Sequence, residues 1–172
     1  MKHVALLRGI NVGGKNIVPM RELAALFTAA GCRDVTTYIQ SGNVIFTAPA
    51  SVLTKLSATV SNAFGVPAVI RSHDELALAI RGNPYLAERV DTKCLHIMFL
   101  ASQPTTAAVA ALDPDRSPPC RFCVKGQDIY LHLPAGVAKT KITNAWIDSK
   151  LSTVSTIRNW NTVLKLLELT RT

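Results

Sequence analysis

The sequence predicts an α+β fold built from two similar halves, each with an antiparallel sheet. The first observation is the order strand, helix, strand, strand, helix, strand over residues 1–71. The second is a linking helix and turn at 72–93, which opens on capping-box spacing, after which a similar pattern begins again over 94–172. The third is a likeness between two predicted hairpins, at 38–46 and 122–130. This is the ferredoxin-like βαββαβ order, so we expect two such halves that arose by internal duplication.

The elements of the first half follow from hydrophobic period and from the positions of glycine and proline. A Val- and Leu-rich strand is followed by a glycine-rich loop and by a helix with Pro19 in its first turn and Gly31 at its end. A hairpin turns at Ser41-Gly42-Asn43, and Ser51 is the expected cap of a second amphipathic helix that Gly65 ends. The predicted strands are 3–8, 35–40, 44–47 and 68–71, and the predicted helices are 19–30 and 52–64.

The second half is predicted to start with a strand and to end in helices. The predicted strands are 95–100, 121–124 and 129–133, with a short helix at 105–112. Ser155 or Thr156 is the expected cap of the last helix. Its expected apolar stripe is Ile157, Trp160, Leu164 and Leu167, and its expected polar face is Arg158, Asn161, Thr162 and Lys165.

The composition is that of a folded protein, with 48% hydrophobic and 17% charged residues. No apolar run is long enough to span a bilayer, and the stretch near the N-terminus is too short for a secretory signal. We therefore expect a cytoplasmic protein with no membrane partner and with its four cysteines reduced. Cys120 and Cys123 have the spacing of half a zinc site but lack a second pair, so no metal site is predicted.

The net charge of +8 is concentrated at the two ends of the chain. Residues 1–33 carry +4, residues 34–138 are neutral, and residues 139–172 carry +4. If the two ends meet in the fold, they form one electropositive face. The alternative is a scattered basic surface that only aids solubility.

The glycine-rich loop Gly9–Asn16 has the G-x-x-x-x-G-K spacing of a P-loop but departs from that motif in two ways. Asn16 stands where a P-loop has a hydroxyl residue for Mg²⁺, and the predicted helix starts too late to face a phosphate. Nucleotide hydrolysis is therefore not predicted. The glycine N–H groups beside Arg8 and Lys15 suit an anion, and a flexible turn with two solvated cations is the alternative.

The polar segments share a chemistry of cations, hydroxyls and amides without carboxylates. This argues against catalysis by a carboxylate pair and against a hard-metal site. It favours binding of phosphate, carboxylate or a nucleic-acid backbone, and no cofactor or catalytic residue is predicted. The predicted anion-binding residues are Arg8, Asn11, Gly13, Gly14, Lys15, Ser41, Asn43, Lys141, Asn144, Arg158, Asn159 and Asn161.

Three functions remain open at this point. The leading one is an anion-binding protein whose ligand contains phosphate, with nucleic acid as one candidate. The second is an enzyme that acts on a small phosphorylated or carboxylated metabolite, with electrostatic stabilisation by Arg8, Lys15 and Arg158. The third is a structural role, in which asparagine motifs tie the fold together without any ligand. The sequence makes no prediction of oligomeric state.

Four motifs resemble a known bacterial family, the uncharacterised Domain of Unknown Function 1697 (DUF1697). The motifs are Leu6–Asn16, Gln40–Val44, Thr143–Ala145 and Arg158–Val163. The resemblance implies two ferredoxin-like α+β halves, and it implies no established activity, cofactor or catalytic residue. Two departures from the family pattern are Ile142, where Leu is usual, and Ile157, where Thr is usual.

Overall fold

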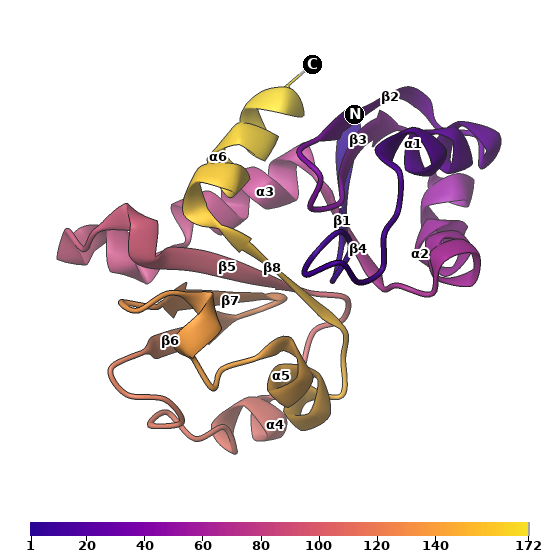
Figure 1. Cartoon of the computed structure of the whole chain (residues 1–172). Helices are drawn as coiled ribbons and strands as arrows, with labels where there is room; N and C mark the ends of the chain where they lie inside the picture. The colour runs from indigo at the N-terminus through magenta and orange to yellow at the C-terminus, as the bar shows by residue number, and fades with distance from the viewer. Residues whose placement is uncertain (172) are drawn as a thin grey trace. The chain divides into compact units, whose positions relative to one another are not determined.

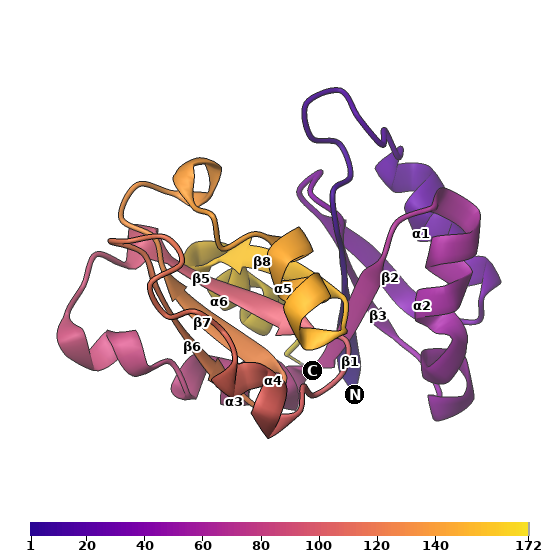
Figure 2. The ribbon, with the colours of Figure 1, turned by 90° about the horizontal axis from the view of Figure 1, so that it is seen from below.

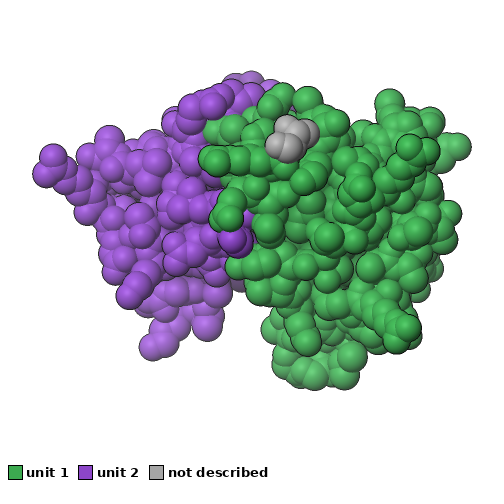
Figure 3. Space-filling view, turned by 90° about the horizontal axis from the view of Figure 1, so that it is seen from above, with its two compact units in different colours: residues 1–77, 166–172 green, residues 78–165 purple. Residues whose placement is uncertain are grey.

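The computed structural model describes residues 1–171, which form two compact units, coloured separately in Figure 3. Unit 1 comprises Met1–Ala77 and the C-terminal residues from Leu166 onward, and unit 2 comprises Leu78–Lys165. Each unit contains one four-stranded antiparallel sheet (Figure 1). The predicted α+β class with two ferredoxin-like halves is therefore confirmed. None of the helices in residues 1–171 combines the length and hydrophobicity that a membrane crossing requires.

Unit 1 repeats the predicted order of elements. These elements are β1 (Lys2–Leu7), α1 (Met20–Ala29), β2 (Arg33–Tyr38), β3 (Asn43–Thr47), α2 (Ala50–Phe64), β4 (Ala68–Ser72) and the start of α3 (His73–Arg81). The sheet order is β2-β3-β1-β4, so β1 lies between two antiparallel neighbours. The predicted capping box opens α3, because Ser72 N–H donates to Glu75 Oε2 (2.7 Å) and Glu75 N–H donates to Ser72 Oγ (3.2 Å).

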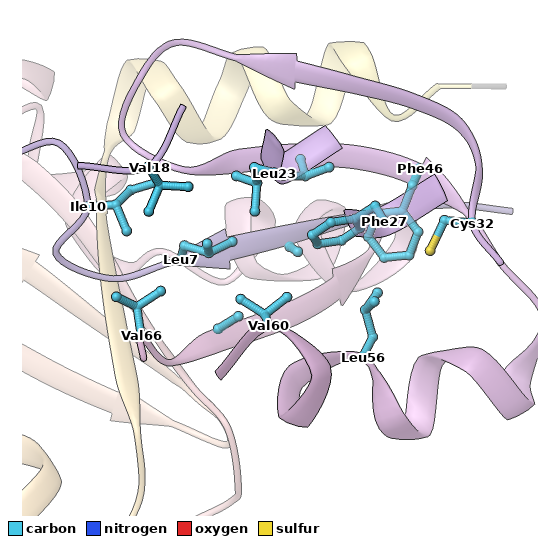
Figure 4. Packing of buried hydrophobic residues seen from close by; sticks show 13 residues of the cluster. Leu7, Ile10, Val18, Leu23, Phe27, Cys32, Phe46, Leu56, Val60 and Val66 are labelled. Atoms are coloured by element: carbon cyan, nitrogen blue, oxygen red, sulfur yellow. The ribbon is translucent and has the colours of Figure 1, made fainter. Parts of the chain in front are cut away.

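The core of unit 1 lies between one face of this sheet and the helices α1 and α2 (Figure 4). Alternation along β1 places Leu7 on this face, where Phe27 of α1 meets Leu56 and Val60 of α2. Phe27 and Phe46 pack edge to face with ring centroids 5.2 Å apart. Full burial of each such side chain stabilises the fold by about 1.5–3 kcal/mol.

The predicted start of α2 at a Ser51 cap is wrong. The helix begins at Ala50, and Pro49 occupies the N-cap position at φ −71° without a side-chain cap. Proline fixes the backbone angle of the entering chain, so the boundary moves toward it. The other end agrees with the prediction, because Gly65 closes α2 in the left-handed region at φ +67°.

Unit 2 has the sheet order β6-β7-β5-β8, which matches that of unit 1 strand for strand. Its core packs Met98, Leu100 and Ile129 of the sheet against Ile147 and Leu151. The elements are η1 (Pro84–Glu88), η2 (Thr92–Cys94), β5 (Leu95–Leu100), α4 (Thr106–Ala110), β6 (Arg121–Lys125), β7 (Asp128–His132), η3 (Val137–Lys139), α5 (Asn144–Leu151), β8 (Ser155–Asn159) and α6 (Trp160–Leu169), of which the last runs on into unit 1.

The prediction of a helix from Ser155 is wrong, because Ser155–Asn159 is the edge strand β8. Thr153–Ile157 is rich in β-branched residues, which favour strands, and Ile157 pairs with Met98 of β5. The cap prediction at Ser155 or Thr156 and the face that combined Arg158 with helical residues are wrong for the same reason. The observed buried face of α6 is Trp160, Val163 and Leu166, whereas Leu164 is 41% exposed.

The strand registers extend the internal repeat to single residues. His3 pairs with Ser72 in unit 1, and His96 pairs with Asn159 in unit 2. One position earlier on β4 and β8 lie Arg71 and Arg158, which are 5% and 8% exposed. Each guanidinium donates to the carbonyl of its preceding isoleucine, at 3.0 Å and 2.8 Å. The two halves therefore share buried arginines as well as topology, which supports duplication.

Candidate anion-binding site

A tight turn forms the tip of the loop that joins β1 to α1. Gly13 and Gly14 both have positive φ, at +58° and +72°. Lys15 N–H donates to the carbonyl of Val12 (3.1 Å), and the two residues form an antiparallel bridge. Two successive positive φ angles are those of a type I′ turn, which glycine adopts without steric cost. The predicted glycines therefore shape a small hairpin tip rather than a phosphate cradle of P-loop type.

Asn11 ties the base of this loop together. Its Nδ2 donates to the carbonyls of Val18 (3.1 Å) and Gln40 (2.8 Å), and its Oδ1 accepts from Val18 N–H (2.9 Å). Asn16 Nδ2 donates to the carbonyl of Gly9 (3.0 Å). Asn11, a predicted anion-binding residue, and its loop neighbour Asn16 thus hydrogen-bond within the fold, as the structural alternative expects of Asn11.

The turn between β2 and β3 is built in a similar way. Asn43 is fully buried, and its Nδ2 donates to the carbonyl of Tyr38 and to Ser41 Oγ, both at 3.1 Å. Gly42 is required here for two reasons. Its φ of +85° favours glycine, and a Cβ at this position would lie 2.8 Å from Leu7 Cβ. The Gln40 carbonyl, which accepts a hydrogen bond from Asn11 Nδ2, belongs to this turn, so the two turns form one end of unit 1.

Several charged and aliphatic side chains of this end are open to solvent. Lys15 is exposed and Arg8 is half-buried, and the segment 8–19 contains no carboxylate. Lys15 is therefore an exposed cation on a short turn that backbone hydrogen bonds hold in place. Three aliphatic side chains of the same end, Val12, Ile17 and Ile39, are also exposed.

The residues predicted in unit 2 lie around α5, β8 and the start of α6. Thr143 caps α5 by accepting from Trp146 N–H (3.1 Å), and Asn144 Oδ1 lies 2.9 Å from Ser155 Oγ. Lys141 is exposed, and its backbone carbonyl accepts from Arg116 Nε (3.4 Å). Beside these residues is a hollow of about 140 Å³. Its lining is Met98, Val137, Thr140, Ile142, Thr143, Asn144 and Ile157.

Arg158 and the asparagines after it have three different environments. Arg158 is 8% exposed, and burial lowers the pKa of its guanidinium from 12.5 to about 10. Asn159 caps α6 by accepting from Thr162 N–H (2.8 Å), and Asn161 is exposed on the first turn of that helix. Of the predicted cations, Lys15 and Lys141 are the exposed ones. The expectation that the two basic ends share one face stays a prediction.

Sequence reasoning missed the exposed aliphatic residues beside Lys15. Apolar residues next to a predicted strand and helix are normally assigned to the core, as Ile10 and Val18 are in the structure. The glycine pair carried a usable signal, because a two-glycine turn in a short loop places its flanking residues at a tip. Within residues 1–171 there is no cluster of three or more potential metal ligands, and the four cysteines are free.

Comparisons with known proteins place the chain in a family. Its residues 1–130 match the family described as "Protein of unknown function (DUF1697)". A solved structure of a conserved bacterial protein from Streptococcus pneumoniae has the same fold, with a TM-score of 0.72 and 23% identity over 99% of this chain and 98% of that one. A comparison with curated proteins finds no match. The resemblance seen in the motifs is therefore confirmed: the chain belongs to the DUF1697 family.

Proposed function

We propose that this protein binds the phosphate groups of a polyanion through the loop between β1 and α1. The observation that carries the proposal is the Val12–Lys15 turn, which holds an exposed ammonium on a base fixed by Asn11. A turn that is already ordered loses little conformational entropy when it binds. Because the segment 8–19 contains no carboxylate, no like-charged side chain of the loop repels an approaching phosphate.

A polymer suits this site better than a small phosphate compound. One exposed ion pair in water contributes only about 1 kcal/mol or less. Useful affinity therefore requires several contacts and the release of counterions from a polyanion. Arg21, exposed beside Glu22 in the first turn of α1, offers a second cation shortly after the loop in the chain.

In this proposal the cations contact the ligand, and the amides hold the loop and turn in their folded conformation. The amide groups of Asn11 and Asn43 donate hydrogen bonds to backbone carbonyls and to Ser41, which agrees with the structural role considered from the sequence. An enzyme built on Arg8, Lys15 and Arg158 needs a solvent-facing Arg158, but that guanidinium is buried. We therefore propose binding and no catalysis. We also propose that binding takes place in the cytoplasm, where the four thiols would stay reduced.

The test is binding of a labelled oligonucleotide, measured by fluorescence anisotropy at several salt concentrations. Lys15→Gln is compared with Lys55→Gln, which removes the same charge from an exposed position on α2. We expect the slope of log affinity against log salt to become shallower by about 0.7–0.9 for Lys15→Gln, which is the loss of one phosphate contact. Lys55→Gln should match the wild type. Equal slopes for all three proteins, or no binding at about 50 mM salt, would contradict the proposal.

A further inference from the structure

The aliphatic side chains next to Lys15 are unusually open to solvent. Ile17 is 74% exposed, Val12 is 62% exposed and Ile39 is 49% exposed. Their burial in unit 1 therefore contributes little to its stability. Single exposed apolar residues are common in folded proteins, and several of them at one end of a domain are a starting point for an interaction surface.

The three side chains belong to one end of unit 1. Val12 and Ile17 flank Lys15 in the loop, which Figure 2 shows as the indigo arch that extends past the ends of the strands. Ile39 belongs to the β2–β3 turn, and the carbonyl of its neighbour Gln40 accepts from Asn11 (2.8 Å). Lys15 thus has aliphatic side chains on its own loop and on the turn to which that loop is bonded.

The backbone of Ile39 adds an independent observation. Its φ is +48°, in the left-handed region, where a β-branched residue costs about 1–2 kcal/mol more than glycine or asparagine. Burial offsets only part of this cost, because half of the side chain is exposed. A glycine at this position would fit the turn better. The exposed isoleucine therefore favours a contact outside the fold.

We infer that the polyanion is duplex DNA, and that Val12 and Ile17 enter its minor groove as apolar wedges beside Lys15. This inference rests on the proposed function. Proteins that bind the minor groove combine cations with aliphatic side chains that partly unstack a base step. Proteins that bind single strands stack bases on exposed aromatic rings. The segment 8–19 contains no aromatic residue, and Tyr38, which precedes the β2–β3 turn, is half-buried. Positive charge, a narrow two-glycine tip and aliphatic flanks match the anionic, groove-shaped surface of a duplex.

The experiment compares a duplex with a single strand of the same sequence, using the whole protein. Val12→Ser/Ile17→Ser is the test variant, and Leu78→Ser is the control, because Leu78 is 61% exposed on α3. We expect the test variant to bind the duplex about tenfold more weakly, with unchanged affinity for the single strand. We also expect the wild type to bring fluorophores at the duplex ends closer together, and the test variant not to. All melting temperatures should agree, because the replaced side chains are exposed.

Three results would overturn the inference. The first is equal wild-type affinity for duplex and single strand. The second is duplex binding that the double substitution leaves unchanged. The third is binding to vesicles of anionic lipid, or to an acidic polypeptide such as polyglutamate, that exceeds binding to the duplex. Each of them leaves the proposed phosphate contact at Lys15 open to its own salt-slope test, whereas no binding to any polyanion overturns both.

Discussion

Replacing Asn11 with alanine removes the side chain that closes the base of the β1–α1 loop. Three hydrogen bonds are lost, to the carbonyls of Val18 and Gln40 and from Val18 N–H, at 2.8–3.1 Å. Each contributes about 0.5–1.5 kcal/mol net, and the half-buried position favours the lower half of that range. Alanine also tolerates the φ of +54° less well than asparagine, by about 1 kcal/mol. We expect a total loss of about 3 kcal/mol.

A matched control separates the hydrogen bonds from the backbone angle. Asn16 lies in the same loop at φ +48°, but its side chain makes one such bond, to the Gly9 carbonyl (3.0 Å). Asn16→Ala carries a similar backbone cost, so it should destabilise the protein by about 1–2 kcal/mol less than Asn11→Ala. At about 2–4 °C per kcal/mol for a chain of this size, the two melting temperatures should differ by several degrees.

Calorimetry gives the melting temperatures, and amide hydrogen exchange locates the change. The Val18 amide is buried and donates to Asn11 Oδ1, so Asn11→Ala should sharply accelerate its exchange. Asn16→Ala should leave that amide protected. If the Val18 amide keeps its protection in Asn11→Ala, or if the two variants melt together, then Asn11 does not hold the loop as we describe.

Three further predictions concern single positions elsewhere. Gly42→Ala should destabilise the fold far more than Gly14→Ala in urea unfolding, because both have positive φ but only Gly42 has side chains 2.8 Å from the added Cβ; equal losses would refute this close approach. Asn159→Ala should cost about 1 kcal/mol through the lost cap of α6, while Asn161→Ala on the same helix should be nearly neutral, so similar melting temperatures would count against the cap. Burial lowers the pKa of His96 from 6.5, so the unfolded chain binds more protons than the folded chain near that pH; the urea midpoint should fall as the pH drops from about 8 to about 6, and a rise would contradict this sign.

Local signals predicted most of unit 1. The strand β1, the glycine-rich loop and the Ser41-Gly42-Asn43 turn depend on residues close in sequence, and the structure confirms each of them. The cap of α2 failed because Pro49, two residues before the expected Ser51, sets the entry of the chain. That error moved a boundary without changing the element.

The strand β8 was missed because its assignment depends on a distant partner. Ile157 and Trp160 have helical spacing, which imitates the stripe of an amphipathic helix. The pairing of Ile157 with Met98 of β5 joins residues far apart in the sequence and decides the outcome. The consequence reaches the site, because Arg158 was expected on a solvent-facing helix and instead lies buried on a strand.

The candidate site was only partly predictable from residue types. The sequence shows that Asn11 and Asn43 are polar residues within motifs. It does not show which backbone groups their amides contact, because those contacts depend on how the two turns pack together. The exposure of Ile17 and Ile39 was equally hidden, because hydrophobic residues are assigned to the core by default. Burial and hydrogen bonding at this end depend on tertiary structure, so residue type alone did not show which side chains are exposed and which hold the loop.

The most direct test of the central claim is an NMR titration of the isotopically labelled protein with a short phosphate polymer. We predict that the largest changes in amide chemical shift occur at Val12, Gly13, Gly14 and Lys15, and that they saturate with added polymer. Changes that are absent from this turn, while signals elsewhere in the chain shift and saturate, would contradict a phosphate contact at the β1–α1 loop.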